Sequence, residues 1–154
     1  MPSALWTVRS ELLSLFTTAF AASDTEVIDG PRKRGQTPRQ YLVVGNELGE
    51  EPHARSVQQP SALAGGWRDE LGEIDCTAVA WSGGDDLAAL RLTVEGIVDA
   101  CETAIAATPT LDGLLQPASN HLELTGLDIR EARTDRGPFV EAALTVSYAT
   151  VLTA

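Results

Sequence analysis

An acidic cluster with one histidine is the group of residues in this sequence most suggestive of chemistry. Glu47, Glu50, Glu51 and His53 lie close together. Carboxylate oxygens are the ligands that hard cations prefer, so this group could in principle bind a metal. Its spacing matches no metal-binding loop, and charges in a stretch rich in Gly and Pro are typical of a solvated loop. We therefore favour solvated loop charge over a metal site.

Other residues that could catalyse a reaction lack the partners they would need. The turn Ser82-Gly83-Gly84 has no histidine nearby and no following P-loop lysine, and Gly65-Gly66 forms no phosphate cradle. Asp85-Asp86 is explained more simply as the N-cap of a helix than as an acid–base pair. His53 and His121 have no positioned partners in sequence. We expect no enzymatic activity and no cofactor.

The sequence has two cysteines, Cys76 and Cys101. One lies in a strand-like run and the other on the apolar side of a helical run, where a thiol behaves as a small hydrophobic residue. Two cysteines and two distant histidines do not make a zinc site. We expect buried free thiols.

The charge balance is strongly acidic, with 11 basic and 22 acidic residues and a net charge of −11. Such a field repels nucleic acid, so a surface that grips DNA through its phosphates is not expected. The charge remains compatible with a protein that surrounds DNA without gripping it. No signal peptide is recognisable, and no apolar stretch approaches the ~20 residues of a membrane span. We expect a protein kept in a cytosol-like compartment, with no membrane partner.

Basic residues cluster at one place, Arg32-Lys33-Arg34, with Arg39 close behind. Two readings remain open: a solvated loop, or a strip that faces an acidic neighbouring subunit and fixes its register. Trp6, Trp67 and Trp81 could likewise be interface anchors, or ordinary core or half-buried aromatics. The candidate subunit-interface residues are Arg32, Lys33, Arg34, Arg39, Glu47, Glu50, Glu51, Asp135 and Arg136.

The hydrophobic periodicity predicts an α+β protein in which two α-helices pack on a mainly antiparallel β-sheet. We expect a single domain over residues 1–154, with a long C-terminal hairpin as its firmest element. Gly72 and Gly126 stand where the apolar phase of a strand changes, which predicts a β-bulge at each. Ser3 is the predicted N-cap of the first helix. The expected elements are helices over 3–21 and 86–107, strands over 25–29, 41–45, 67–81, 120–133 and 140–148, loops over 31–39 and 46–66, and a hairpin turn over 134–137.

The order of these elements resembles the tail terminator and tail-completion proteins of long-tailed bacteriophages, especially those of actinobacterial hosts. The resemblance covers most of the chain and consists of ordered weak signals, with no single diagnostic motif. Besides the first helix and the alternating last strand, it is carried by Val27–Pro31, Tyr41–Gly45, Arg68–Cys76 and Thr108–Gly113.

This resemblance implies a structural virion protein without catalysis or cofactor. Such subunits form a hexameric ring on the last ring of the tail tube protein, end tube polymerisation and present a surface to the head–tail connector protein. DNA passes through the ring without specific binding. The protein would reside at the head-proximal end of the tail after assembly in the host cytoplasm. Loops 31–39 and 46–66 and the turn 134–137 are the expected contact segments.

Two alternatives remain open. One is a head-completion or connector protein of the phage neck, which the order of elements separates poorly from a tail terminator. The other is a small-molecule-binding or enzymatic α+β domain, which would require a concave pocket with convergent polar groups.

Overall fold

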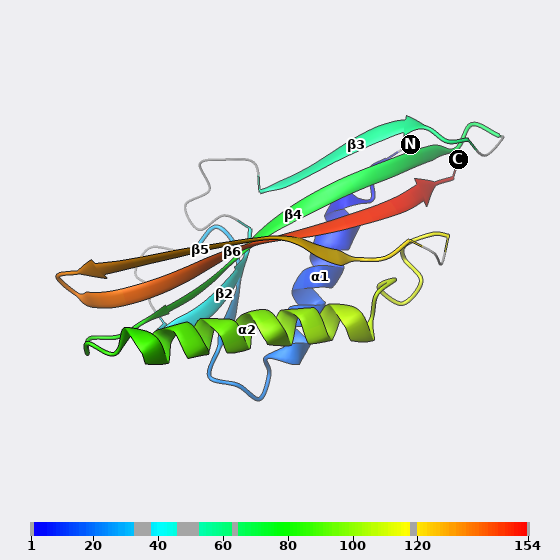
Figure 1. Ribbon diagram of the computed structural model, residues 1–154. Helices are drawn as coiled ribbons and strands as arrows, with labels where there is room; N and C mark the ends of the chain where they lie inside the picture. The colour runs from blue at the N-terminus through cyan, green and yellow to red at the C-terminus, as the bar shows by residue number, and fades with distance from the viewer. Residues whose placement is uncertain (1, 33–37, 46–52, 63–64, 118–119, 154) are drawn as a thin grey trace.

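A computed structural model describes residues 2–32, 38–45, 53–62, 65–117 and 120–153. The described part of the chain forms two helices and one six-stranded sheet, which confirms the predicted α+β fold with its C-terminal hairpin (Figure 1). In chain order the elements are α1 (Leu5–Ala19), β1 (Glu26–Asp29), β2 (Gln40–Val44), β3 (Ala54–Pro60), β4 (Arg68–Trp81), α2 (Leu87–Ala107), β5 (Glu123–Thr134) and β6 (Gly137–Leu152).

The sheet is built around two long strands, β4 and β6, which pair from Arg68↔Leu152 to Trp81↔Phe139. Its order is β1-β2-β4-β6-β5, and β3 also pairs with β4. Strands β2 and β3 share one edge of β4, because β2 pairs with residues 76–80 and β3 with residues 68–74. Only the pairing of β1 with β2 is parallel among the described strands. The sheet is therefore mixed but mostly antiparallel.

Both helices contribute to one hydrophobic core on one face of this sheet. Figure 1 shows α2 running along the strands while α1 crosses it steeply. The buried residues of α2 recur every three or four positions, which places them on one side of the helix. They are Leu90, Val94, Ile97, Val98, Cys101, Ala104 and Ile105. Cys76 on β4 is buried in the same core, so both cysteines are buried free thiols, as predicted.

The predicted helix caps are confirmed for α2 and corrected for α1. The carboxylate of Asp86 accepts a hydrogen bond from the backbone N–H of Ala89 at 3.0 Å, which satisfies a donor of the first turn. In α1 the cap position belongs to Ala4, not Ser3. The hydroxyl of Ser3 still accepts a hydrogen bond from the N–H of Leu5 at 3.0 Å, one position before the cap.

Two sequence predictions about the strands were wrong. The predicted loop 46–66 contains β3, which has few apolar residues of its own and owes its extended form to pairing with β4. The predicted bulge at Gly72 is absent, since β4 pairs through this position without a shift in register. Leu71 is apolar but exposed, so the change of phase in the sequence marks apolar residues on the opposite face of a regular strand.

A close contact accounts for Gly72 instead. A Cβ atom at this position would lie 2.1 Å from a ring carbon of Tyr148, which stands opposite on β6. The glycine therefore leaves room for the Tyr148 ring. The bulge predicted at Gly126 is confirmed by a register shift between Leu124 and Gly126, and the turn between β5 and β6 closes at Thr134↔Gly137 as predicted.

A fully buried carboxylate, Glu70, joins several elements at the end of the sheet farthest from this turn. Its oxygens accept hydrogen bonds from the Tyr148 hydroxyl at 2.7 Å, the Gln58 side-chain amide at 2.9 Å and the backbone N–H of Ala4 at 3.1 Å. Burial and then this hydrogen bond raise the pKa of Tyr148. The carboxylate thereby connects β4 with β6, β3 and the start of α1.

Among the described residues, no helix is both long enough and apolar enough to cross a bilayer.

Candidate functional site

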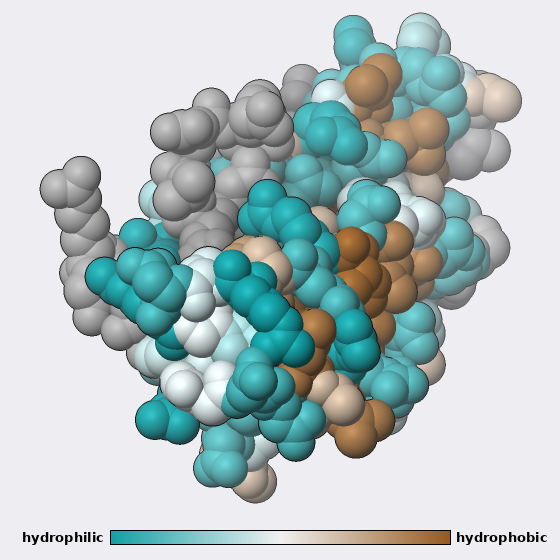
Figure 2. Space-filling view, turned by 60° about the vertical axis from the view of Figure 1, so that its left-hand side comes forward, coloured by the Kyte–Doolittle hydropathy of each residue, from teal (hydrophilic) through white to brown (hydrophobic). Residues whose placement is uncertain are grey.

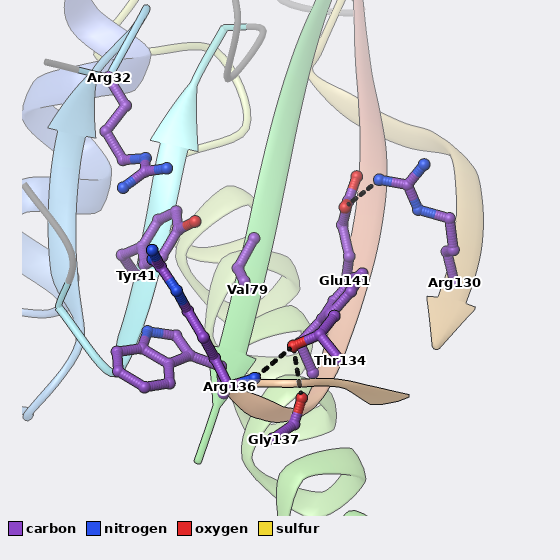
Figure 3. A pocket seen from close by; sticks show the side chains of 10 residues that line it. Arg32, Tyr41, Val79, Arg130, Thr134, Arg136, Gly137 and Glu141 are labelled. Atoms are coloured by element: carbon purple, nitrogen blue, oxygen red, sulfur yellow. Dashed lines mark hydrogen bonds and ion pairs between the residues drawn. The ribbon is translucent and has the colours of Figure 1, made fainter. Parts of the chain in front are cut away.

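The face of the sheet opposite the helices carries a half-open cavity of about 310 Å³ near the hairpin turn. We call it the arginine hollow, because arginine and aromatic side chains dominate its walls (Figure 3). Its lining residues are Arg32, Tyr41, Val79, Trp81, Arg130, Thr134, Arg136, Gly137, Phe139 and Glu141.

Strand register brings these distant residues together. Tyr41 stands opposite Val79 in the β2–β4 pair, and Trp81 stands opposite Phe139 in the β4–β6 pair. The hairpin turn then lies against the end of β4. Gly137 has a φ of +112°, and a Cβ there would lie 2.1 Å from the carbonyl oxygen of Ser82, so this position requires glycine.

Two arginines stack on the aromatic rings of this region. The guanidinium carbon of Arg32 lies 5.4 Å from the centre of the Tyr41 ring, and that of Arg39 lies 5.9 Å from the Trp81 ring. Both distances are within the range of cation–π attraction. The Trp81 indole donates a hydrogen bond to the carbonyl of Pro38 at 2.7 Å, which fixes the ring that Arg39 covers.

Arg136 approaches the hollow from the hairpin turn. Figure 3 shows its side chain reaching toward Tyr41, while Arg32 approaches the same ring from the other side. The Thr134 hydroxyl accepts a hydrogen bond from the N–H of Arg136 at 3.2 Å and donates one to the carbonyl of Gly137 at 2.9 Å. The turn is therefore held in shape beneath an exposed guanidinium.

One acidic side chain lines the hollow, and it is already paired. Glu141 lies 2.6 Å from Arg130 across the β5–β6 hairpin. Arg32, Arg39 and Arg136 place three guanidinium groups beside apolar ring faces. Guanidinium groups bind carboxylates and phosphates in two-pronged geometry, so the hollow is suited to an anionic group carried on an apolar body.

The structure brings together only part of the predicted set of interface residues. Arg32 and Arg136 line the hollow, Arg39 flanks it, and Asp135 lies exposed in the hairpin turn. The other predicted residues, which are Lys33, Arg34, Glu47, Glu50 and Glu51, lie outside the described residues. Sequence reasoning missed Tyr41, Phe139 and Arg130 as members of the site, because they meet only through the strand order β2-β4-β6-β5.

A second surface lies on the helix side of the edge strand β5. Leu127 and Ile129 are 47% and 57% exposed, and they stand opposite the core residues Leu144 and Ala142 on β6. Directly opposed residues point to the same face, so this apolar pair faces the helix side. In the view of Figure 2, hydrophobic side chains form a narrow line with hydrophilic ones on both sides.

An ion pair connects this surface with α2. Arg91 donates to both carboxylate oxygens of Glu131 on β5, at 2.6 and 2.7 Å. The hydrogen bonds from Arg91 lower the pKa of Glu131 and raise the pKa of Arg91. Exposed acidic residues continue along α2 from Arg91 at helical spacing. This acidic row is Glu95, Asp99 and Glu102.

The three tryptophans differ in exposure, and none of them is fully buried. Trp6 on α1 is 77% exposed, so it is not a core residue. Trp81 is half-buried and forms a wall of the arginine hollow.

The two buried thiols of the core ionise less readily than exposed thiols would. Burial raises the pKa of Cys76 to about 12 and also raises the pKa of Cys101.

No protein-family model matches this chain, and a search of curated proteins found no similar sequence.

Proposed function

We propose that the protein is a structural subunit that caps the head-proximal end of a bacteriophage tail tube as a hexameric ring. The ring ends polymerisation of the tail tube protein and presents a surface to the head–tail connector protein. The order of elements that resembles tail terminators supports this proposal. The confirmed hairpin and α2 belong to that order.

The observation that carries the proposal is the exposed edge strand β5. It has twelve residues and, within the described part of the chain, pairs only with β6. A long open edge strand has unpaired backbone N–H and C=O groups, so it can pair with another chain unless it is covered. The apolar pair Leu127 and Ile129, beside charged side chains of β5 and α2, has the composition of an interface with an apolar centre and a polar rim.

A ring of identical subunits requires two different contact surfaces on each copy. The helix-side surface of β5 and α2 would be one of them. The two faces of the closed ring then meet different partners, which is how one small subunit can stop the tube on one side and receive the head on the other. The net charge of −11 supports a channel that lets DNA pass without holding it.

Polymerisation of the purified tail tube protein of the same virus tests this function. We expect the protein to bind tube ends and shorten the tubes, since a capped end adds no further rings. The variant Leu127→Gln/Ile129→Gln should fold normally and lose most of this capping, because its interface loses its apolar centre. The control is Val57→Gln on β3, an apolar residue at the other end of the sheet that is more exposed than Leu127 or Ile129. If adding the unmodified protein does not change the length of the tubes, the proposal is contradicted.

A neck protein on the connector side is the second candidate, and the same surfaces are compatible with it. Binding to the connector protein without any effect on tube length would favour that role.

A further inference from the structure

We propose that the arginine hollow of one copy binds the acidic row of α2 on the next copy. This inference rests on the proposed ring and names its second contact surface. Head-to-tail contact needs two complementary patches that lie on different sides of the subunit. The hollow lies on the sheet face that the helices leave open, and the acidic row lies on the outer side of α2.

The charges of the two patches are complementary, and four of their charged side chains have no ionic partner among the described residues. The side chains of Glu95, Asp99 and Glu102 form no hydrogen bond or ion pair with any other described residue. Within the same described part, the guanidinium of Arg136 has no hydrogen-bonding or ionic partner. A chain with twice as many acidic as basic residues therefore keeps several of its arginines at one open hollow.

The hollow is also shaped for such a contact. Arginine and aromatic side chains are the residue types most enriched at the energetic centre of protein interfaces. Here Tyr41, Trp81 and Phe139 supply rigid apolar walls, and Arg32 and Arg39 are already held over two of these rings. Side chains fixed before binding lose less conformational entropy when a carboxylate arrives.

The apolar pair on β5 and the acidic row on α2 would act as one surface. Arg91 joins the two elements through Glu131, and Glu95 follows Arg91 by one helical turn. A carboxylate of this row entering the hollow would therefore bring Leu127 and Ile129 against the neighbouring copy. Complementary charge would fix the register, while the apolar pair would add affinity.

Charge reversal in the full-length protein tests the contact. Arg136→Glu and Asp99→Arg should each weaken self-association at least tenfold, measured by sedimentation velocity of the free protein and by co-sedimentation with tail tubes. The double variant Arg136→Glu/Asp99→Arg should recover most of the association, because it restores opposite charges at every interface. A mixture of the two single variants should also recover association, with the variants alternating, because both mixed contacts pair opposite charges and both contacts between like variants repel.

Matched controls keep the net charge the same. Arg68→Glu and Glu11→Arg change exposed residues outside both patches and should leave association within about twofold of the unmodified protein. Circular dichroism and urea unfolding of every variant establish that it is folded.

The outcomes distinguish a failure of this contact from a failure of the proposed ring. If the unmodified protein forms rings and the reversed variants do so equally well, the contact is wrong and the proposed function stands. Loss of association in Arg136→Glu without loss in Asp99→Arg would assign the hollow to a different partner and overturn the contact. An unmodified protein that never associates, free or on tubes, would overturn both.

Discussion

The two ends of strand β4 differ in how their acidic and basic side chains are buried. At one end Glu70 is fully buried, and three donors from β6, β3 and the start of α1 satisfy its carboxylate. At the other end, beside Trp81, arginines gather around an open hollow of about 310 Å³. The acidic side chain is thus enclosed within a single subunit, whereas Arg39 and Arg136 at the hollow are exposed.

This difference indicates that the Glu70 end of the strand stabilises the fold, whereas the arginine hollow is a surface for contact with other molecules. A buried polar group must find its hydrogen-bonding partners inside the fold, because leaving it unpaired there costs about 1–3 kcal/mol or more. Exposed arginines carry no such requirement, and ion pairs at a surface contribute little to folding. We therefore expect changes near Glu70 to alter stability and changes at the hollow to alter association.

The largest expected effect is that of Glu70→Ala. The substitution leaves the buried hydroxyl of Tyr148 without its acceptor and opens a cavity, so it should lower the free energy of unfolding by about 3–5 kcal/mol. Urea denaturation measures this loss. Glu73→Ala, three residues along the same strand, is the control. Glu73 is only partly buried and forms a surface ion pair with Arg55, so this change should cost less than about 1 kcal/mol. A loss of similar size in both variants would remove the distinction between the two ends.

A second prediction concerns alkaline pH and the thiols of the core. The pKa of Cys76 is raised from 9.0 to about 12 in the folded protein, so its stabilising contribution is complete below pH 9 and is lost as the pH rises toward about 12. The slope is at most about 1.4 kcal/mol per pH unit for each thiol, and Cys101 acts in the same direction.

The measurement is the free energy of unfolding of the reduced protein at about pH 8 and about pH 10. Cys76→Ala/Cys101→Ala should lose less stability over this interval than the unmodified protein. Tyr148 remains in both proteins, so the comparison isolates the thiols. Equal losses would show that the thiols ionise as readily in the fold as outside it.

The smallest expected effect on stability belongs to the hollow. Arg136→Ala should change the free energy of unfolding by less than about 0.5 kcal/mol, since its guanidinium is exposed and the turn is held by backbone and threonine contacts. Thermal unfolding followed by circular dichroism measures the change. A loss as large as that of Glu70→Ala would make Arg136 part of the framework.

Local patterns in the sequence predicted the elements that form through neighbouring residues. The apolar spacing of α2, the cap at Asp86 and the alternation along β6 follow from residues a few positions apart, and each is confirmed. Strand β3 was missed because Ala54–Pro60 becomes a strand only by pairing with β4. The error at Gly72 has a related cause, since exposed and buried apolar residues look alike in a sequence.

The hollow depends on still longer-range information. The sequence indicated Arg32, Arg39 and Arg136 as contact residues, but it did not place them together. Their meeting requires β2 and β6 to lie on either side of β4, so that Tyr41 and Phe139 approach Trp81. Strand order is set by packing of the whole chain, which local periodicity does not encode.

Electron microscopy of tail tubes assembled with the purified protein tests the central claim most directly. We expect a closed hexameric ring at one end of each tube, with its subunits in contact through β5 and α2, and no further tube protein beyond it. Tubes with bare ends that continue to grow in excess protein would contradict the account.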